Sequence, residues 1–157
     1  MGYKSVILVV QDVIKSSTLY QSVFCMKVIE DHGIYNVGFD GGLSLYQREL
    51  FENISKVKLI ESKSNSIAVY FEYNNIDYIQ EKAKATGLDF IHFIEEQPWG
   101  QLVFRVYDYD NHLIEVAENM DNCLQRLSKN NMSIQDIAIK TGYSEDYVKG
   151  KISTINN

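Results

Sequence analysis

Proline, cysteine and long apolar runs are scarce in this sequence of 157 residues, and each scarcity argues against a class of protein. One proline, nine glycines and no low-complexity tract argue against a disordered or collagen-like chain. The two cysteines, Cys25 and Cys123, lack the short spacing of a metal or redox motif, so we expect free thiols in a cytoplasmic protein. No apolar run reaches about 18 residues, so a membrane span is not expected.

Positive charge is also in short supply. The net charge is −6, and the imbalance lies in residues 1–118, which hold 10 Lys and Arg against 17 Asp and Glu. Nucleic-acid binding depends on clustered basic residues that neutralise phosphates, so a nucleic-acid partner is not expected. The sign of the charge favours a cationic small molecule instead.

The sequence does contain an order of elements that occurs twice. Ser5–Gln11 is apolar and β-branched, as in a buried strand, and Asp12 can cap a helix whose apolar residues recur at helical spacing to about Phe24. Three short strands are then expected at Lys27–Glu30, Tyr35–Phe39 and Leu43–Gln47.

The same order follows a polar connector at residues 48–64, which we expect to be irregular. Asn74 or Asn75 can cap the second helix, and Gly87 can follow its end. The sequence therefore predicts one domain over residues 1–118, built from two β-α-β-β-β modules at about 1–47 and 65–118. The expected strands of the second module are Ser66–Tyr73, Leu88–Ile94, Gln101–Tyr107 and His112–Ala117.

Residues 119–157 form a tail with apolar residues at helical spacing. Ser133 and Asp136 form a capping pair, Gly142 can end that helix, and Ser144 can cap the next. The stretch Met132–Ile152 resembles the helix-turn-helix of DNA-binding regulators. Its second helix carries only two lysines behind two acidic residues, so we expect a structural helical pair that packs on the domain or on a second subunit.

Two stretches of the domain resemble the vicinal oxygen chelate superfamily, which includes glyoxalase I, bleomycin-resistance proteins and extradiol dioxygenases. Ser5–Val28 matches the strand–Asp–helix opening of that family. Phe104–Val116 (FRVYDYDNHLIEV) matches its common strand–turn–strand pattern, with Tyr109 and Asn111 in place of the usual proline and glycine. The resemblance covers about residues 3–118.

This resemblance implies an α+β fold. The two modules would form a curled, incompletely closed barrel of mixed sheet with helices on its convex side, and the tail would add a small helical appendage. Members of the superfamily often form dimers, so a homodimer is expected.

Metal-dependent members of the superfamily bind a divalent ion through four strand residues, usually His, Gln or Glu. The resemblance puts these positions at Ser5, Ser44, Ser66 and Glu115. Serine hydroxyls are poor ligands for Ni, Zn, Mn or Fe, and one carboxylate cannot hold such an ion tightly. We therefore expect neither a metal nor another cofactor.

Strand alternation puts small, aromatic and acidic side chains on the concave face of the expected barrel. Aromatic rings with a carboxylate suit a planar or cationic ligand. Glu115 needs a partner there, which could be Arg105 on the neighbouring strand, a ligand cation or a proton. The candidate ligand-binding residues are Ser5, Ser44, Tyr46, Ser66, Tyr70, Trp99, Arg105 and Glu115.

These patterns favour binding over catalysis: a glyoxalase- or bleomycin-resistance-like protein that holds a small molecule without an intact metal site. One alternative is a metal-dependent lyase, isomerase or thiol transferase of the glyoxalase type, in which Glu115 is the metal ligand or general base. A second alternative is a ligand-sensing regulator that acts through the helical tail.

Overall fold

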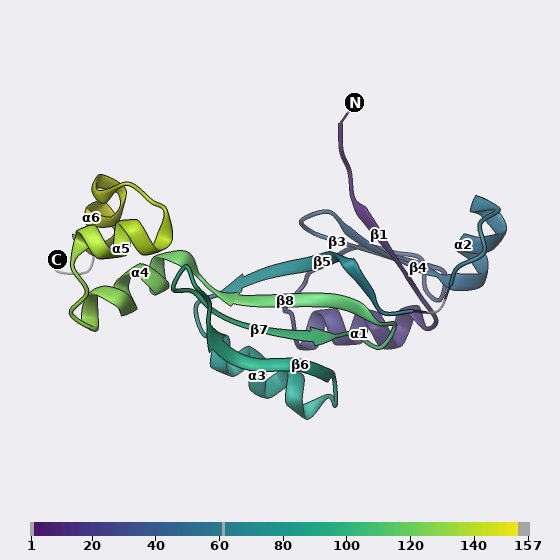
Figure 1. The fold of residues 1–157 in the computed structure, drawn as a ribbon. Coiled ribbons are helices and arrows are strands. Elements are labelled where there is room, and N and C mark those ends of the chain that lie inside the picture. Colours follow the sequence, from purple (N-terminus) through teal and green to yellow (C-terminus); the bar gives the residue numbers. More distant parts are fainter. Residues whose placement is uncertain (1, 61, 154–157) are drawn as a thin grey trace.

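In the computed structural model, which describes residues 2–60 and 62–153, two β-α-β-β-β modules precede a group of C-terminal helices (Figure 1). The first module consists of β1 (Val6–Val10), α1 (Val13–Ser22), β2 (Val28–Asp31), β3 (Asn36–Phe39) and β4 (Leu43–Gln47). The second consists of β5 (Ser64–Tyr73), α3 (Ile76–Ala85), β6 (Asp89–Glu96), β7 (Leu102–Tyr107) and β8 (His112–Glu118).

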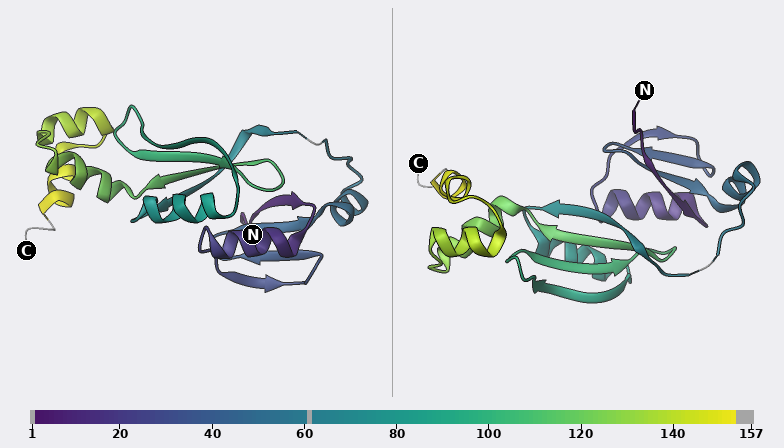
Figure 2. Two further views of the ribbon diagram at one scale, coloured as in Figure 1. Left: turned by 90° about the horizontal axis from the view of Figure 1, so that it is seen from below. Right: turned by 45° about the horizontal axis from the view of Figure 1, so that its top comes forward.

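Each module forms its own mixed sheet of four strands. The strand orders are β1-β4-β3-β2 and β5-β8-β7-β6, with β1 parallel to β4 and β5 parallel to β8. Helix α1 covers one face of the first sheet and α3 covers one face of the second (Figure 2). Over the described residues the two sheets do not close into a barrel. The predicted α+β fold of two modules with a helical appendage is confirmed.

Two polar side chains start the module helices. Asp12 Oδ1 accepts a hydrogen bond from the backbone N–H of Lys15 at 2.9 Å, and Asn75 Oδ1 accepts one from the N–H of Tyr78 at 3.0 Å. Each cap satisfies a donor that the first helical turn leaves without a backbone partner. Gly87 follows α3 with a φ of 71°, in the left-handed region that favours glycine.

Alternation along the strands builds the core between sheets and helices. Strand alternation also predicts that the residues on the opposite side from the concave face are apolar and buried under the helices, but two of them, Val6 and Ile67, are 39% and 66% exposed. Val6 is the first residue of its strand, and Ile67 lies where the pairing of β5 with β8 shifts, between Ser64 and Ala68. The core phase of β1, β4 and β8 is buried as predicted, at Leu8, Val10, Leu43, Leu45, Ile114 and Val116.

The connector is partly helical, which the sequence analysis did not predict. Helix α2 spans Arg48–Ser55, and the Gln47 side chain caps it by accepting a hydrogen bond from the N–H of Leu50 at 2.8 Å. The ring of Phe51 packs edge-on against Tyr46, with centroids 6.3 Å apart. The helix has only about two turns, which is too short for apolar periodicity to indicate it.

A buried aspartate joins the two modules. Asp108 Oδ2 accepts a hydrogen bond from the Tyr20 hydroxyl at 2.9 Å and lies 2.9 Å from Nδ1 of His112. Its Oδ1 accepts from the backbone N–H groups of Asp110 and His112 at 3.0 and 2.8 Å. Burial opposes a charge on His112, but the hydrogen bond and charge of Asp108 raise its pKa overall. Asp108 therefore attaches α1 of the first module to the β7–β8 turn of the second.

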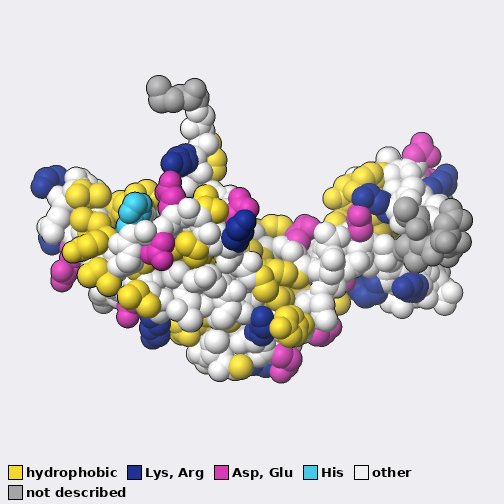
Figure 3. Space-filling model, turned by 180° about the vertical axis from the view of Figure 1, so that it is seen from behind, with side chains coloured by type: hydrophobic (Ala, Val, Ile, Leu, Met, Phe, Trp, Pro, Cys, Tyr) yellow, Lys and Arg dark blue, Asp and Glu magenta, His cyan; other side chains and the backbone are white. Residues whose placement is uncertain are grey.

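The tail forms a helical unit at one end of the molecule, opposite α2 (Figure 3). Its helices are α4 (Met120–Lys129), α5 (Ile134–Thr141) and α6 (Glu145–Ser153). None of the helices in the described part of the chain has the length and hydrophobicity needed to cross a membrane. The unit has a core of its own, made of Cys123, Leu124, Leu127, Ile137 and Val148.

Replacing Asp108 with alanine is expected to lower the free energy of unfolding by about 3 kcal/mol, because a buried hydroxyl and two backbone N–H groups lose their acceptor. Urea denaturation followed by circular dichroism measures the change. Asp89→Ala is the control: this exposed carboxylate pairs with Lys63, and its loss is expected to cost less than about 1 kcal/mol. Equal losses in the two variants would contradict the role assigned to Asp108.

Candidate ligand-binding face

Four polar residues form a row across the second sheet. The strand registers align Tyr70 of β5 with Glu115 of β8, Glu115 with Arg105 of β7, and Arg105 with His92 of β6. Residues paired in this way lie on the same face of a sheet. Arg105 stands between two residues of β7 that pack in the core with α3, so the row is on the opposite face. We call this surface the polar face.

The row contains an ion pair. Arg105 Nη2 lies 2.5 Å from Glu115 Oε2, and Arg105 Nη1 lies 2.9 Å from His92 Nε2. Because a guanidinium can only donate, His92 Nε2 must accept, and its Nδ1–H then donates to the carbonyl of Phe93 at 2.8 Å. Both ring nitrogens of His92 are thereby used, and Arg105 is the partner that Glu115 requires.

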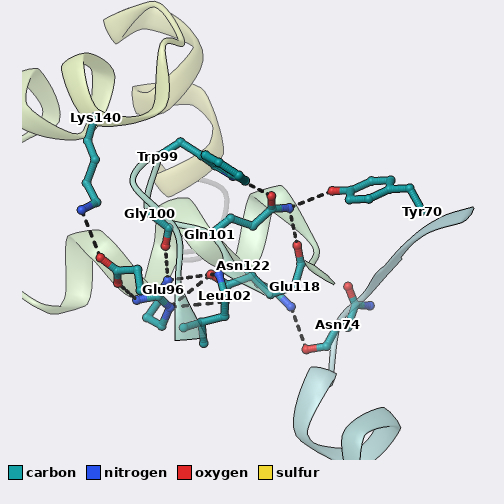
Figure 4. A network of polar contacts seen from close by, with 11 residues as sticks. Tyr70, Asn74, Glu96, Trp99, Gly100, Gln101, Leu102, Glu118, Asn122 and Lys140 are labelled. Atoms are coloured by element: carbon teal, nitrogen blue, oxygen red, sulfur yellow. Dashed lines mark hydrogen bonds and ion pairs between the residues drawn. The ribbon is translucent and has the colours of Figure 1, made fainter. Parts of the chain in front are cut away.

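A chain of hydrogen bonds runs along one end of the polar face (Figure 4). Trp99 Nε1 donates to Gln101 Oε1 at 2.9 Å, and Gln101 Nε2 donates to the Tyr70 hydroxyl at 3.1 Å. The Tyr70 hydroxyl donates to Glu72 Oε1 at 2.8 Å. Burial and then this bond to Glu72 raise the pKa of Tyr70 to about 12, so the hydroxyl remains protonated near neutral pH. Tyr70 and Trp99 are 48% and 39% exposed and offer aromatic surface here.

A cavity of about 530 Å³ lies between the two modules and adjoins the polar face. Ile7 and Val9 of β1, Leu113 of β8, and Leu59 and Ile60 of the connector are among its lining residues. Leu113 is two residues before Glu115 on the same strand, so both side chains lie on one face. The volume is in the range of small-molecule sites, roughly 300–1,000 Å³.

The structure brings only part of the predicted site together. Tyr70, Trp99, Arg105 and Glu115 meet on the polar face of the second sheet. The described lining of the cavity includes none of the eight predicted ligand-binding residues. The other four belong to the first module or to the start of β5: Ser5, Ser44, Tyr46 and Ser66.

The sequence analysis missed two residues of the polar face. Gln101 has the same strand phase as Arg105, so alternation along the β7 segment contained the signal for it. His92 was not among the predicted site residues. Its alignment with Arg105 depends on two register shifts between β6 and β7, which no sequence pattern indicated.

The family's metal positions do not suit a metal in this chain. Ser5 lies seven residues before the helix cap Asp12. The corresponding position of the second module was assigned to Ser66, but the residue at the same distance before the second cap, Asn75, is Ala68. The hydroxyl of Ser5 is a poor metal ligand, and the methyl group of Ala68 cannot be one. Glu115 is already paired with Arg105. Among the described residues, no group of three or more His, Cys, Asp or Glu side chains is placed to hold a metal ion.

Comparison with protein families now adds to this geometry. Residues 3–121 match the family model described as a glyoxalase-like domain. The chain belongs to this family. It is thereby a member of the vicinal oxygen chelate superfamily, as the strand–turn–strand pattern around Asp108 and Glu115 indicated.

Solved structures show the same fold. A protein of unknown function from Agrobacterium tumefaciens is 34% identical, with 76% of this chain and 94% of that chain covered and a TM-score of 0.67. A glyoxalase/bleomycin resistance protein/dioxygenase family enzyme from Burkholderia phytofirmans is 18% identical, with 75% and 98% covered and a TM-score of 0.66. The fosfomycin resistance protein FosX from Listeria monocytogenes is 23% identical, with 76% and 93% covered and a TM-score of 0.57. A comparison with curated proteins gives no match.

The protein is expected to retain far less than one metal ion per chain after equilibration with Ni, Zn, Mn and Fe and desalting, because Glu115 is paired and its neighbouring family positions lack ligands. Elemental mass spectrometry measures the retained metal. Glu115→Ala serves as the comparison and is expected to match the wild type. Near-stoichiometric metal that disappears in Glu115→Ala would overturn this interpretation of the site.

Proposed function

We propose that this glyoxalase-like protein binds and sequesters a small planar aromatic molecule, preferentially a cation, on the polar face and in the adjoining cavity. The single observation that carries the proposal is the arrangement of Tyr70, Trp99 and the Glu115–Arg105 pair on one face of the second sheet, the face from which Leu113 reaches a cavity of about 530 Å³. Aromatic surface supplies the contact area, and charge decides which ligands are attracted.

The charge on the polar face supports a cation. Among the described residues of this face are four carboxylates, those of Glu72, Asp89, Glu95 and Glu115, and two cations, Arg105 and Lys63. Arg105 pairs with Glu115 and Lys63 with Asp89, which leaves Glu72 and Glu95 to attract a positive ligand. The acidic composition of the domain acts in the same direction over longer distances.

The names of two matched structures refer to resistance against small molecules, which supports a small molecule as the ligand. One of the matched structures is described as a fosfomycin resistance protein and another as belonging to a glyoxalase/bleomycin resistance protein/dioxygenase family. These descriptions concern those proteins, and at 23% and 18% identity the likeness to this chain is one of fold.

The lyase or isomerase alternative has less support from the residues. Glu115 is the acid that would act as general base, and the guanidinium of Arg105 occupies its Oε2. That oxygen is not free to accept a proton from a substrate while the ion pair is formed. The polar face therefore suits binding better than proton transfer.

A thermal-shift screen of planar aromatic cations, beginning with acridine orange, against neutral aromatic molecules of similar size tests the proposal. We expect cations to raise the melting temperature more than the neutral molecules do, because binding to the folded state stabilises it. The absence of any stabilising cation, or equal stabilisation by the neutral molecules, would contradict a site that selects by charge.

The Tyr70→Ala variant locates the site. We expect it to weaken acridine orange binding about three-fold in isothermal titration calorimetry, because one exposed cation–π contact is lost. Tyr78→Ala is a matched control, since Tyr78 is 54% exposed but lies on α3, which covers the other face of the sheet. Equal affinity in the two variants would place the ligand elsewhere.

A further inference from the structure

One arginine of the tail attaches the C-terminal helices to the end of the second sheet. Arg126 of α4 donates from Nε to Glu118 at 3.2 Å and from Nη1 to Glu96 at 2.9 Å. Its Nη2 donates to the carbonyl of Gly100 and to Glu118. All three nitrogens of the guanidinium are used, and they reach the ends of β6 and β8 and the turn between β6 and β7.

Lys140 and a close contact at Gly100 also attach the tail to this end of the sheet. Lys140 of α5 lies 3.0 Å from Glu96, and the two cations lower the pKa of that carboxyl, Arg126 most strongly. Gly100 has a φ of 93°, and a Cβ there would lie 3.0 Å from both Leu127 Cδ1 and Lys140 Cε. The turn therefore packs directly on α4 and α5, and a side chain at position 100 would push them away.

Gly100 separates the two residues that form one end of the polar face, Trp99 and Gln101. Gln101 is 5% exposed and connects both sides: its Nε2 donates to the backbone carbonyl of Glu118 at 2.8 Å and to the Tyr70 hydroxyl at 3.1 Å. Trp99 in turn donates to Gln101 (Figure 4). The backbone that presents both side chains is thus held by the carbonyl contact of Arg126 at Gly100.

The attaching residues lie outside the family domain. The glyoxalase-like model ends at residue 121, and the three structures compared above cover 75–76% of this chain while covering 93–98% of their own. Arg126, Leu127 and Lys140 therefore belong to a segment that is added to the family fold. The added segment contacts the candidate binding face at the turn that carries its tryptophan.

We propose that the C-terminal helices control ligand binding at the polar face, with Arg126 as the positioning residue that holds Trp99 and Gln101. This inference rests on the proposed function for its ligand. Coupling between two sites is reciprocal, so a ligand that contacts Trp99 and Gln101 also stabilises the docked position of the helices. The tail is then a regulatory segment, because the position of its helices changes the affinity of the polar face for its ligand.

The positioning role is tested first without any ligand. Trp99 is the only tryptophan in the sequence, so acrylamide quenching of its fluorescence reports this turn alone. We expect Arg126→Gln to raise the quenching constant about two-fold, because local opening exposes the ring. Lys129→Gln is the matched control, an exposed cation at the end of the same helix, and is expected to leave quenching unchanged. Equal quenching in wild type and Arg126→Gln overturns the inference.

A milder variant guards against simple misfolding of the tail. Lys140→Gln removes one ion pair to Glu96 and leaves Arg126 in place, and we expect quenching between the wild type and Arg126→Gln. Circular dichroism shows whether helix content is kept in each variant. If Arg126→Gln loses helix content, Lys140→Gln becomes the deciding variant. Quenching in Lys140→Gln equal to that of the wild type then contradicts the inference.

The link to binding is then measured with acridine orange. We expect its Kd to rise about ten-fold in Arg126→Gln and to stay unchanged in Lys129→Gln, a size typical of coupling between sites. An unchanged Kd in Arg126→Gln, with binding intact in the wild type, contradicts control of the site by the tail. If the wild type itself does not bind, the proposed function fails, whereas the quenching result still decides whether Arg126 positions Trp99.

Discussion

The carboxylate of Asp108 is the interaction on which the arrangement of the two modules depends. It accepts hydrogen bonds from the hydroxyl of Tyr20 and from two backbone N–H groups, and it pairs with His112. Helix α1, the β7–β8 turn and the first residue of β8 are thereby held in one geometry. Because β8 is a central strand of the second sheet, this geometry also sets where Glu115 stands relative to the cavity beside β1.

The polar face illustrates how one fold can serve different chemistry by changing charge. A carboxylate at the position of Glu115 can hold a metal ion only with further ligands nearby, and here a guanidinium stands opposite it in the register. The ion pair satisfies the carboxylate within the sheet itself. In the proposed function, the aromatic rings and the remaining acidic groups of the face select the ligand, and no metal ion is required.

Much of the fold could be predicted from local patterns. The caps Asp12 and Asn75 and the strand alternation around Glu115 each depend on a few neighbouring residues, and each appears in the structure. Helix α2 has too few turns to show periodicity, and β6 meets β7 through bulges that shift the register. The short length of α2 and the irregular pairing of β6 with β7 leave no regular period in the sequence from which they could be predicted.

The site was predictable to a smaller degree for the same reason. Arg105 and Glu115 lie on consecutive strands joined by a short turn, so their pairing could be anticipated from alternation alone. Gly100 and Arg126 come from separate elements, and the sequence contains no sign that a helix of the tail reaches the β6–β7 turn. Hydrogen bonds between long side chains of different helices and strands form only in the tertiary structure, and they produce no periodic pattern in the sequence.

The parallel pairing inside each module has a consequence for how the chain folds. The first strand of each sheet binds its last, with Val6 opposite Leu43 and Ala68 opposite Leu113, so neither sheet is complete until its final strand has been synthesised. Tyr20 of the first module finds its partner only in Asp108. During translation the first module therefore remains without its last buried contact until the β7–β8 turn leaves the ribosome, and the two modules become a stable domain together.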